Sequence, residues 1–88
     1  MDIKSWKIML AVDDYGSFTR VGAELGYTQS GITQMMKNLE KKVGFPLYIK
    51  DHHGITLTNE AKSLIPAIRT LLNADEVIHQ EIAALNGA

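Results

Sequence analysis

Residues 17–36 constrain the fold most strongly, because they hold two short helix-forming stretches with very few residues between them. Gly26 suits the turn between these stretches, since glycine accepts a positive φ without steric cost. Thr28 is of a residue type that caps helix N-termini, and it begins the second stretch. Gly22 permits a close approach of the two helices, and Ile32 is the apolar anchor of the second one. The segment therefore predicts a helix-turn-helix.

Helix signals continue on both sides of this segment. Asp2 can cap a first helix and Gly16 can end it. Ser17 caps a second helix that runs to Leu25, and a third helix is predicted over residues 28–43. Residues at helical spacing predict an apolar stripe on the first helix, with Asp13 as its only polar member. The stripe consists of Ile3, Trp6, Met9, Leu10 and Asp13.

The third helix has two chemically different faces. At about 100° per residue, one side is apolar and the opposite side is polar and basic. We expect the apolar side to pack on a core and the polar side to be the binding surface. The apolar side consists of Ile32, Met35, Met36, Leu39 and Val43, and the polar side of Ser30, Gln34, Lys37 and Lys41, flanked by Thr33.

A small β-hairpin is expected next. Two β-prone segments, 45–50 and 55–57, flank a glycine-containing turn at residues 51–54. Pro46 stands at the start of the first strand, where its missing N–H is tolerated. The expected fold is mainly α, with a three-helix core and a hairpin.

A long last helix is predicted over residues 59–85, with Thr58 as its cap. At 1.5 Å per residue it would be ~40 Å long and would protrude from a domain this small. Pro66 lies inside it and cannot donate to the carbonyl of Lys62, which predicts a kink. An apolar seam with heptad spacing runs along this helix, broken only by Asp75. Its members are Ala61, Leu64, Ile68, Leu71, Asp75, Ile78, Ile82 and Leu85.

Two interpretations of this seam are possible. Packing on the helix's own domain explains its first members and Ile65, but not the apolar positions out to Leu85. A dimerising helix explains both and is favoured. We therefore divide the chain into a domain of residues 1–58 and a dimerisation helix of residues 59–88. The residues expected at the dimer interface are Leu64, Ile68, Leu71, Ile78, Ile82 and Leu85.

Composition excludes several classes of protein. The chain has 88 residues and no cysteine, so it holds neither disulfides nor thiolate metal sites. Residues 1–58 carry seven Lys/Arg and six Asp/Glu, whereas residues 59–88 carry two and four, so the acidic excess lies in the last helix. The N-terminus lacks the pattern of a signal peptide, and no apolar run is long enough to span a bilayer. We expect a cytoplasmic protein that makes no contact with membranes.

An enzyme is not expected. The sequence contains no phosphate-binding glycine loop and no cysteine nucleophile, and its histidines lack a nucleophile with an orienting partner. His52 and His53 are adjacent in a turn, and such neighbours rarely converge on one metal ion. We therefore expect neither a metal nor a cofactor.

The order of elements resembles the N-terminal DNA-binding domain of LysR-type transcriptional regulators over residues 1 to about 80. The resemblance implies a winged helix-turn-helix, in which the hairpin is the wing. The chain departs from the usual family pattern at Val21-Gly22, at Ser30-Gly31, at Gln34 and in its arginine-free wing. The matching residues are Gly16-Ser17-Phe18-Thr19-Arg20, Leu25, Gln29, Thr33, Leu39-Glu40, Gly44, Pro46-Leu47, Leu57-Thr58 and Ala61.

In this motif the first part of the third helix enters the major groove of double-stranded DNA. Glutamine pairs with adenine, lysine with guanine or phosphate, and a threonine methyl can touch the thymine methyl. Geometry favours Thr33 and Gln34 over Gln29, which can instead act locally at the helix start, whereas the resemblance favours Gln29. The residues expected to contact bases are Gln29, Ser30, Thr33, Gln34 and Lys37.

Phosphate contacts are expected from helix starts and from the wing. For Arg20 a solvated surface charge is the alternative. The wing histidines would lie near the minor groove, where their protonation could tune DNA binding. The residues expected at phosphates or in the wing are Ser17, Thr19, Arg20, Thr28, Lys50, His52 and His53.

The partners implied are an inverted-repeat DNA site and a second copy of the chain. A small-molecule effector would bind only a C-terminal domain that this chain does not contain, so we expect an isolated or truncated domain. Two alternatives stay open. One is a winged helix of another regulator class, such as the molybdate-responsive type. The other is a protein-interaction or dimerisation module whose basic face is incidental.

Overall fold

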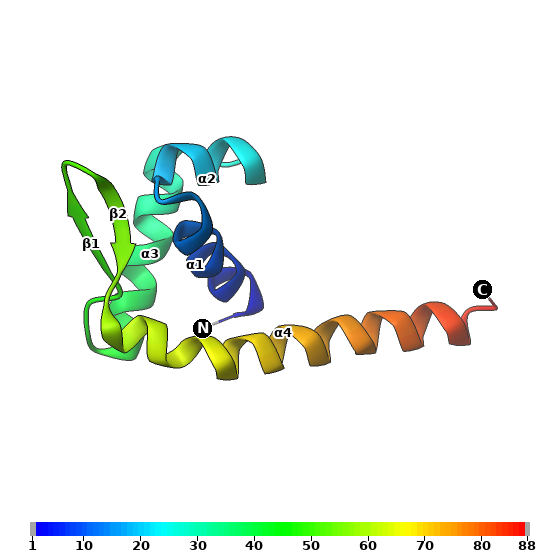
Figure 1. Ribbon diagram of the computed structural model, residues 1–88. Coiled ribbons are helices and arrows are strands. Elements are labelled where there is room, and N and C mark those ends of the chain that lie inside the picture. The colour runs from blue at the N-terminus through cyan, green and yellow to red at the C-terminus, as the bar shows by residue number, and fades with distance from the viewer. Residues whose placement is uncertain (1, 88) are drawn as a thin grey trace.

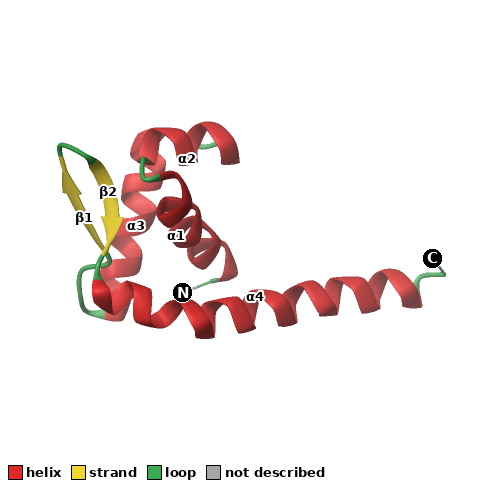
Figure 2. Ribbon diagram, viewed as in Figure 1, coloured by secondary structure: helices red, strands yellow, loops and turns green. Residues whose placement is uncertain are grey.

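The computed structural model describes residues 2–87, which form four helices and one antiparallel hairpin. Three helices and the hairpin make a body from which the last helix protrudes, within overall dimensions of 51 × 26 × 20 Å (Figures 1 and 2). The expected fold, a mainly helical winged helix-turn-helix with a long last helix, is confirmed. The elements are α1 (Ile3–Tyr15), α2 (Phe18–Leu25), α3 (Gln29–Val43), β1 (Tyr48–Asp51), β2 (Gly54–Leu57) and α4 (Asn59–Leu85).

The predicted capping residues set the helix boundaries. The Asp2 carboxylate accepts the Ser5 N–H at 2.9 Å, which lowers the pKa of Asp2, and Thr28 Oγ1 accepts the Gly31 N–H at 3.0 Å. Ser17 and Thr58 cap α2 and α4 in the same way. These bonds satisfy N–H groups that lack a partner within the helix. The third helix thus begins one residue after Thr28.

The turn between α2 and α3 depends on Gly22. A Cβ atom at this position would lie 2.6 Å from the carbonyl oxygen of Tyr27, which is too close for any side chain. The Gly22 carbonyl also accepts the N–H groups of Gly26 and Tyr27, at 2.9 and 2.8 Å. Gly26 has a φ of 82°. The roles predicted for both glycines are therefore confirmed.

The stripe predicted for α1 is partly wrong. Trp6 and Met9 are buried as expected, but Leu10 is only half-buried and Asp13 is exposed. Ile8 and Val12, which the prediction omitted, are buried instead. The reason is that α1 packs against α2, α3, β2 and α4, so that its buried face is wider and rotated relative to a single stripe. The apolar face predicted for α3 is confirmed at Ile32, Met36 and Leu39 and is half-buried at Met35 and Val43.

The hairpin is attached to the junction of α1 and α2. The Ile55 N–H donates to the Gly16 carbonyl at 2.9 Å, and the Ile55 and Leu57 side chains are buried in the core. Gly54, which pairs with Asp51 across the hairpin, has a φ of 122°. A Cβ at Gly54 would lie 2.7 Å from the Gly16 oxygen. The wing therefore docks backbone against backbone, at a position that only glycine fits.

Substituting Gly54 with alanine is expected to lower the free energy of unfolding by about 1–3 kcal/mol, because the new methyl group must push the wing away from Gly16. Urea unfolding followed by circular dichroism measures this loss. His52→Ala, an exposed change at the tip of the same hairpin, is the control and should stay within about 0.5 kcal/mol of the native chain. Equal stability of the two variants would show that the wing does not depend on this close approach.

The first half of α4 belongs to the core. Ala61 and Ile68 are buried, and Leu64 packs against the core while half-exposed. The cap residue Thr58 also donates its hydroxyl to the Pro46 carbonyl at 2.9 Å. The helix continues through Pro66, and its first turns lie at an angle to the straight remainder in Figure 1. The core therefore extends beyond the predicted boundary at residue 58.

Candidate nucleic-acid interface

The polar face of α3 lies next to the helix-turn-helix turn, as the sequence predicts. Gln29, Ser30, Gln34 and Lys37 are exposed, and Thr33 is half-buried. All five side chains come from one helix, whose opposite face is fixed in the core. A rigid element that presents polar side chains is what sequence-specific contact with a nucleic acid requires, because the side chains keep their spacing when they bind.

Hydrogen bonds along α3 already order three of these side chains. The Thr33 hydroxyl donates to the Gln29 carbonyl at 3.1 Å, and Gln29 Nε2 donates to Thr33 Oγ1 at 3.4 Å. One turn later, Gln34 Nε2 donates to Asn38 Oδ1 at 2.9 Å. Sequence reasoning missed Asn38, although its spacing of four residues from Gln34 on one helix face could have revealed it. The polar face of α3 therefore contains an amide pair, not an isolated glutamine.

Lys37 points toward the hairpin. Its Nζ atom lies 5.2 Å from the centre of the Tyr48 ring and 3.9 Å from Glu40 Oε1. The Tyr48 hydroxyl and, after it, the Glu40 carboxylate raise the pKa of Lys37. The ammonium group is thus held at the junction of α3 and β1. The sequence did not identify Tyr48, because the contact joins residues on different elements.

Two of the three predicted phosphate-binding hydroxyls, those of Ser17 and Thr28, cap helices. Ser17 Oγ accepts the Arg20 N–H at 3.3 Å, and Thr28 Oγ1 accepts an N–H while lying 3.3 Å from Ser30 Oγ. Thr19 is exposed in the first turn of α2. These residues and their N–H groups lie at the two helix N-termini, where backbone dipoles favour an anion.

Two cations lie over tyrosine rings near these helix starts. The Arg20 guanidinium is 5.0 Å from the centre of the Tyr15 ring, and Lys4 Nζ is 4.9 Å from that of Tyr27. The Tyr27 hydroxyl raises the pKa of Lys4. Arg20 therefore has an aromatic partner on its own domain, which a freely solvated surface charge lacks. Sequence reasoning did not identify the contact between Lys4 and Tyr27, because no pattern along the chain links the two residues.

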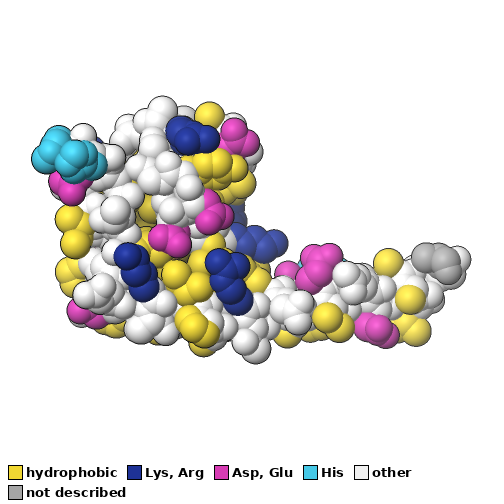
Figure 3. All heavy atoms as spheres, in the orientation of Figure 1, with side chains coloured by type: hydrophobic (Ala, Val, Ile, Leu, Met, Phe, Trp, Pro, Cys, Tyr) yellow, Lys and Arg dark blue, Asp and Glu magenta, His cyan; other side chains and the backbone are white. Residues whose placement is uncertain are grey.

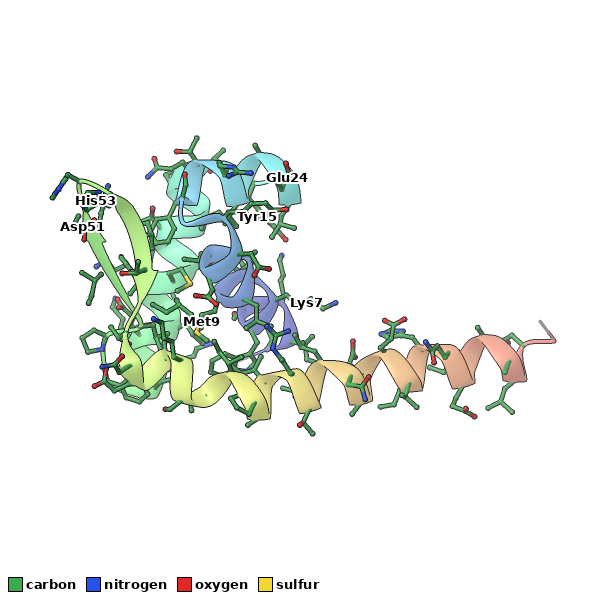
Figure 4. The ribbon with its side chains drawn as sticks, viewed as in Figure 1. Lys7, Met9, Tyr15, Glu24, Asp51 and His53 are labelled. Atoms are coloured by element: carbon green, nitrogen blue, oxygen red, sulfur yellow. The ribbon has the colours of Figure 1, made fainter. Side chains whose placement is uncertain are left out.

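The wing tip carries the two adjacent histidines. Their rings lie 3.9 Å apart, and the His53 N–H donates to Asp51 Oδ1 at 2.8 Å. Figure 3 shows histidine side chains at the far end of the hairpin, and Figure 4 places Asp51 and His53 there. Lys50 is exposed in β1. Within residues 2–87, no group of three or more His, Asp or Glu side chains could hold a metal ion.

The predicted dimer residues fall into two groups. Ile68 is buried within its own domain, which leaves it little surface for a partner, and Leu64 is half-buried. Leu71, Ile78, Ile82 and Leu85 are exposed, by 43, 57, 50 and 85%, as is Val77. Hydrophobic side chains recur along the protruding part of α4 in Figure 3. In the part of the chain that the structure describes, no helix is long and apolar enough to cross a membrane.

Comparison with known proteins gives consistent results. The family model for bacterial regulatory helix-turn-helix proteins of the lysR family matches residues 3–62, more than half of the chain. The HTH-type transcriptional regulator CzcR of Bacillus cereus is 32% identical over 78 residues, which cover 88% of this chain and 27% of CzcR. The HTH-type transcriptional activator CmpR of Synechocystis is 31% identical over 85 residues, 97% of this chain and 28% of CmpR.

The solved structures agree with these relatives. The crystal structure of a CbnR DBD–DNA complex superposes with a TM-score of 0.86 at 26% identity, covering 96% of this chain and 97% of that one. Full-length CbnR, a LysR family transcriptional regulator, gives a TM-score of 0.87 at 26% identity, with coverage of 96% and 29%. The chain thus spans little more than a quarter of the length of the curated relatives CzcR and CmpR.

Proposed function

The chain belongs to the LysR family of bacterial regulatory helix-turn-helix proteins, and we propose that it binds double-stranded DNA in a sequence-specific manner to regulate transcription. The observation that carries this proposal is the exposed polar face of α3, held by a buried opposite face beside a docked wing. A major groove about 12 Å wide accepts one α-helix. The relative CbnR was crystallised as a DBD–DNA complex with the same fold.

In the proposed complex, Gln29, Ser30, Thr33 and Gln34 contact bases from α3. Glutamine amides pair with adenine N6 and N7, so the site is expected to favour adenine at the positions that they contact. The N-termini of α2 and α3 lie against the backbone and bring their N–H groups to phosphates. The proposed phosphate and wing contacts are those of Ser17, Thr19, Arg20, Thr28, Lys50, His52 and His53.

We also propose that two copies pair through the protruding half of α4. The seam side chains Leu71, Ile78, Ile82 and Leu85 are exposed, and among the described residues the hydrophobic side chains that pack against the core reach no further along α4 than Leu72. Isolated helices of this length are marginal in water, so a partner would stabilise it. Two paired domains would place their α3 helices in successive major grooves of an inverted repeat.

Other aspects of the function follow from this proposal. The domain binds DNA and catalyses no reaction, and it acts in the bacterial cytoplasm, where the chromosome lies. A small-molecule effector would bind residues outside this chain. Assignment to the LysR family replaces the molybdate-responsive alternative. A protein-interaction module without DNA binding remains the rival that an experiment must exclude.

The test is selection of bound sequences from a random DNA pool, followed by titration of the selected site at several salt concentrations. Gln34→Ala should relax preference at one base pair, by about 1–3 kcal/mol of discrimination. Lys50→Ala should weaken binding to all sequences alike and reduce the salt slope by about 1. These two effects separate base contacts from phosphate contacts.

Lys7→Ala is the matched control for Lys50→Ala. Lys7 is an exposed lysine on α1, and Figure 4 shows it on the side of α1 away from the wing. Its removal should change neither the salt slope nor base preference. If no sequence is enriched, the chain does not bind DNA in a sequence-specific manner. If it also shows no salt-dependent binding to DNA of any sequence, it is an interaction module.

A further inference from the structure

A small cluster joins the recognition helix α3 to the wing. It consists of Lys37 and Glu40, one turn apart on α3, and Tyr48, the first residue of β1. Lys37 Nζ lies over the Tyr48 ring at 5.2 Å and near Glu40 Oε1 at 3.9 Å. A lysine on a helix surface samples many rotamers. Here an aromatic face, a hydroxyl and a carboxylate all favour one position of the ammonium group.

Both partners of Lys37 are themselves fixed. The Tyr48 ring meets the buried Phe18 ring of α2 edge-on, with centroids 4.9 Å apart and planes at 75°. Tyr48 also pairs with Leu57 in the hairpin. Glu40 Oε2 accepts the Leu47 N–H at 2.8 Å, so its carboxylate anchors the loop before β1. The cluster thus ties Lys37 to α2, to the wing and to the α3–β1 loop.

Exposure within the cluster is unequal. The Lys37 side chain is 56% exposed, whereas that of Glu40 is 17% exposed. The carboxylate therefore lies behind and the ammonium group in front, toward solvent. One Glu40 oxygen also accepts the Leu47 N–H, which turns the carboxylate toward the loop before β1. The Lys37 ammonium group is therefore the most exposed charge of the cluster.

We infer that Tyr48 and Glu40 are positioning residues that hold Lys37 for a DNA phosphate and keep it from a base edge. This inference rests on the proposed DNA binding. A phosphate needs only a charge at the right place, whereas guanine O6 and N7 require the lysine to extend into the groove. Extension would abandon the ring, the hydroxyl and the carboxylate together. The sequence left both a base contact and a phosphate contact open for Lys37, and the cluster favours the phosphate contact.

The first arm of the test uses Lys37→Met, which keeps the aliphatic stem and removes the charge. The salt slope of DNA binding should fall by about 1, and the sequences enriched from a random pool should stay those of the native chain. A changed preference at one base pair with an unchanged salt slope would overturn the inference and return Lys37 to the base contacts.

The second arm uses Tyr48→Phe, which keeps the ring and its contact with Phe18 but removes the hydroxyl. Because that hydroxyl raises the pKa of Lys37, the variant should lower it toward the ordinary lysine value in an NMR titration of the Lys37 side chain. Tyr48→Leu, which also removes the ring, should weaken DNA binding about 2–5-fold with no change in base preference. A Lys37 pKa unmoved by Tyr48→Phe would overturn the positioning role.

Tyr27→Phe is the matched control for the second arm. It removes a hydroxyl that raises the pKa of another lysine, Lys4, and should leave the pKa of Lys37 unchanged. The NMR arm needs no DNA, so it reports on positioning even if the proposed function fails. A native chain that binds no DNA would overturn the phosphate role together with the proposed function. If the native chain binds DNA and the Lys37→Met variant prefers different bases, the inference about Lys37 is overturned but the proposed DNA binding is not.

Discussion

Replacing Ile32 with alanine is expected to lower the free energy of unfolding by about 2–5 kcal/mol. Ile32 is fully buried in the core, on the apolar face of α3. The truncation removes apolar contacts and leaves a cavity that the surrounding side chains fill only in part. Small domains are stable by about 5–15 kcal/mol in total, so this loss is a large part of the whole. Urea unfolding at fixed temperature measures it.

The control for this change lies two residues away on the same helix. Gln34→Ala removes an exposed side chain from the opposite face and should alter the free energy of unfolding by no more than about 0.5 kcal/mol. The pair separates the two faces of α3: Ile32→Ala should act on stability and Gln34→Ala on base preference. If both variants unfold at the same urea concentration, Ile32 is not the anchor of the recognition helix.

Replacing Ile78 and Ile82 together with glutamate is expected to raise the dimer dissociation constant at least ~100-fold. The two side chains are 57 and 50% exposed on the protruding half of α4. In a dimer they would be covered by the partner, and burying unpaired carboxylates there would cost several kcal/mol. Because the side chains are exposed in the single chain, the monomer should stay folded. Sedimentation velocity over a concentration series measures the change.

Asn73→Glu with Gln80→Glu is the matched control. It adds the same charge to exposed positions of α4 that lie away from the apolar seam, so the dimer should persist. The double Ile variant should also lose affinity for a site with two half-sites while keeping weak affinity for one half-site. A native chain that sediments as a monomer at micromolar concentration, yet binds two half-sites tightly, would contradict dimerisation through α4.

The local features of the fold could be predicted because they depend on residues close in sequence. Thr28 and Thr58 cap the helices that follow them, and Gly26 adopts the left-handed conformation that a tight turn needs. The need for Gly22 was also visible, since the turn brings it against Tyr27, five residues away. The polar face of α3 followed from helical periodicity alone, and the Gln34–Asn38 pair could have been found in the same way.

The errors concern positions where several elements meet. The stripe on α1 omitted Ile8 and Val12, because periodicity predicts one contact direction and α1 has four neighbours. The seam on α4 includes Ile68, which satisfies both the heptad pattern and the packing on its own domain and is buried there. A pattern along one helix cannot distinguish these two kinds of apolar neighbour.

The sequence by itself determined the elements, their order, the polar face of α3 and the family, because capping, turn chemistry and periodicity act over a few residues. Only the tertiary structure decided which residues of different elements come into contact. Lys37 is held over Tyr48, and Gly54 fits against Gly16, 38 positions earlier in the numbering, because folding brings separate elements within contact distance. Contacts of this kind depend on how α2, α3 and the hairpin pack together, and no spacing along the chain encodes them.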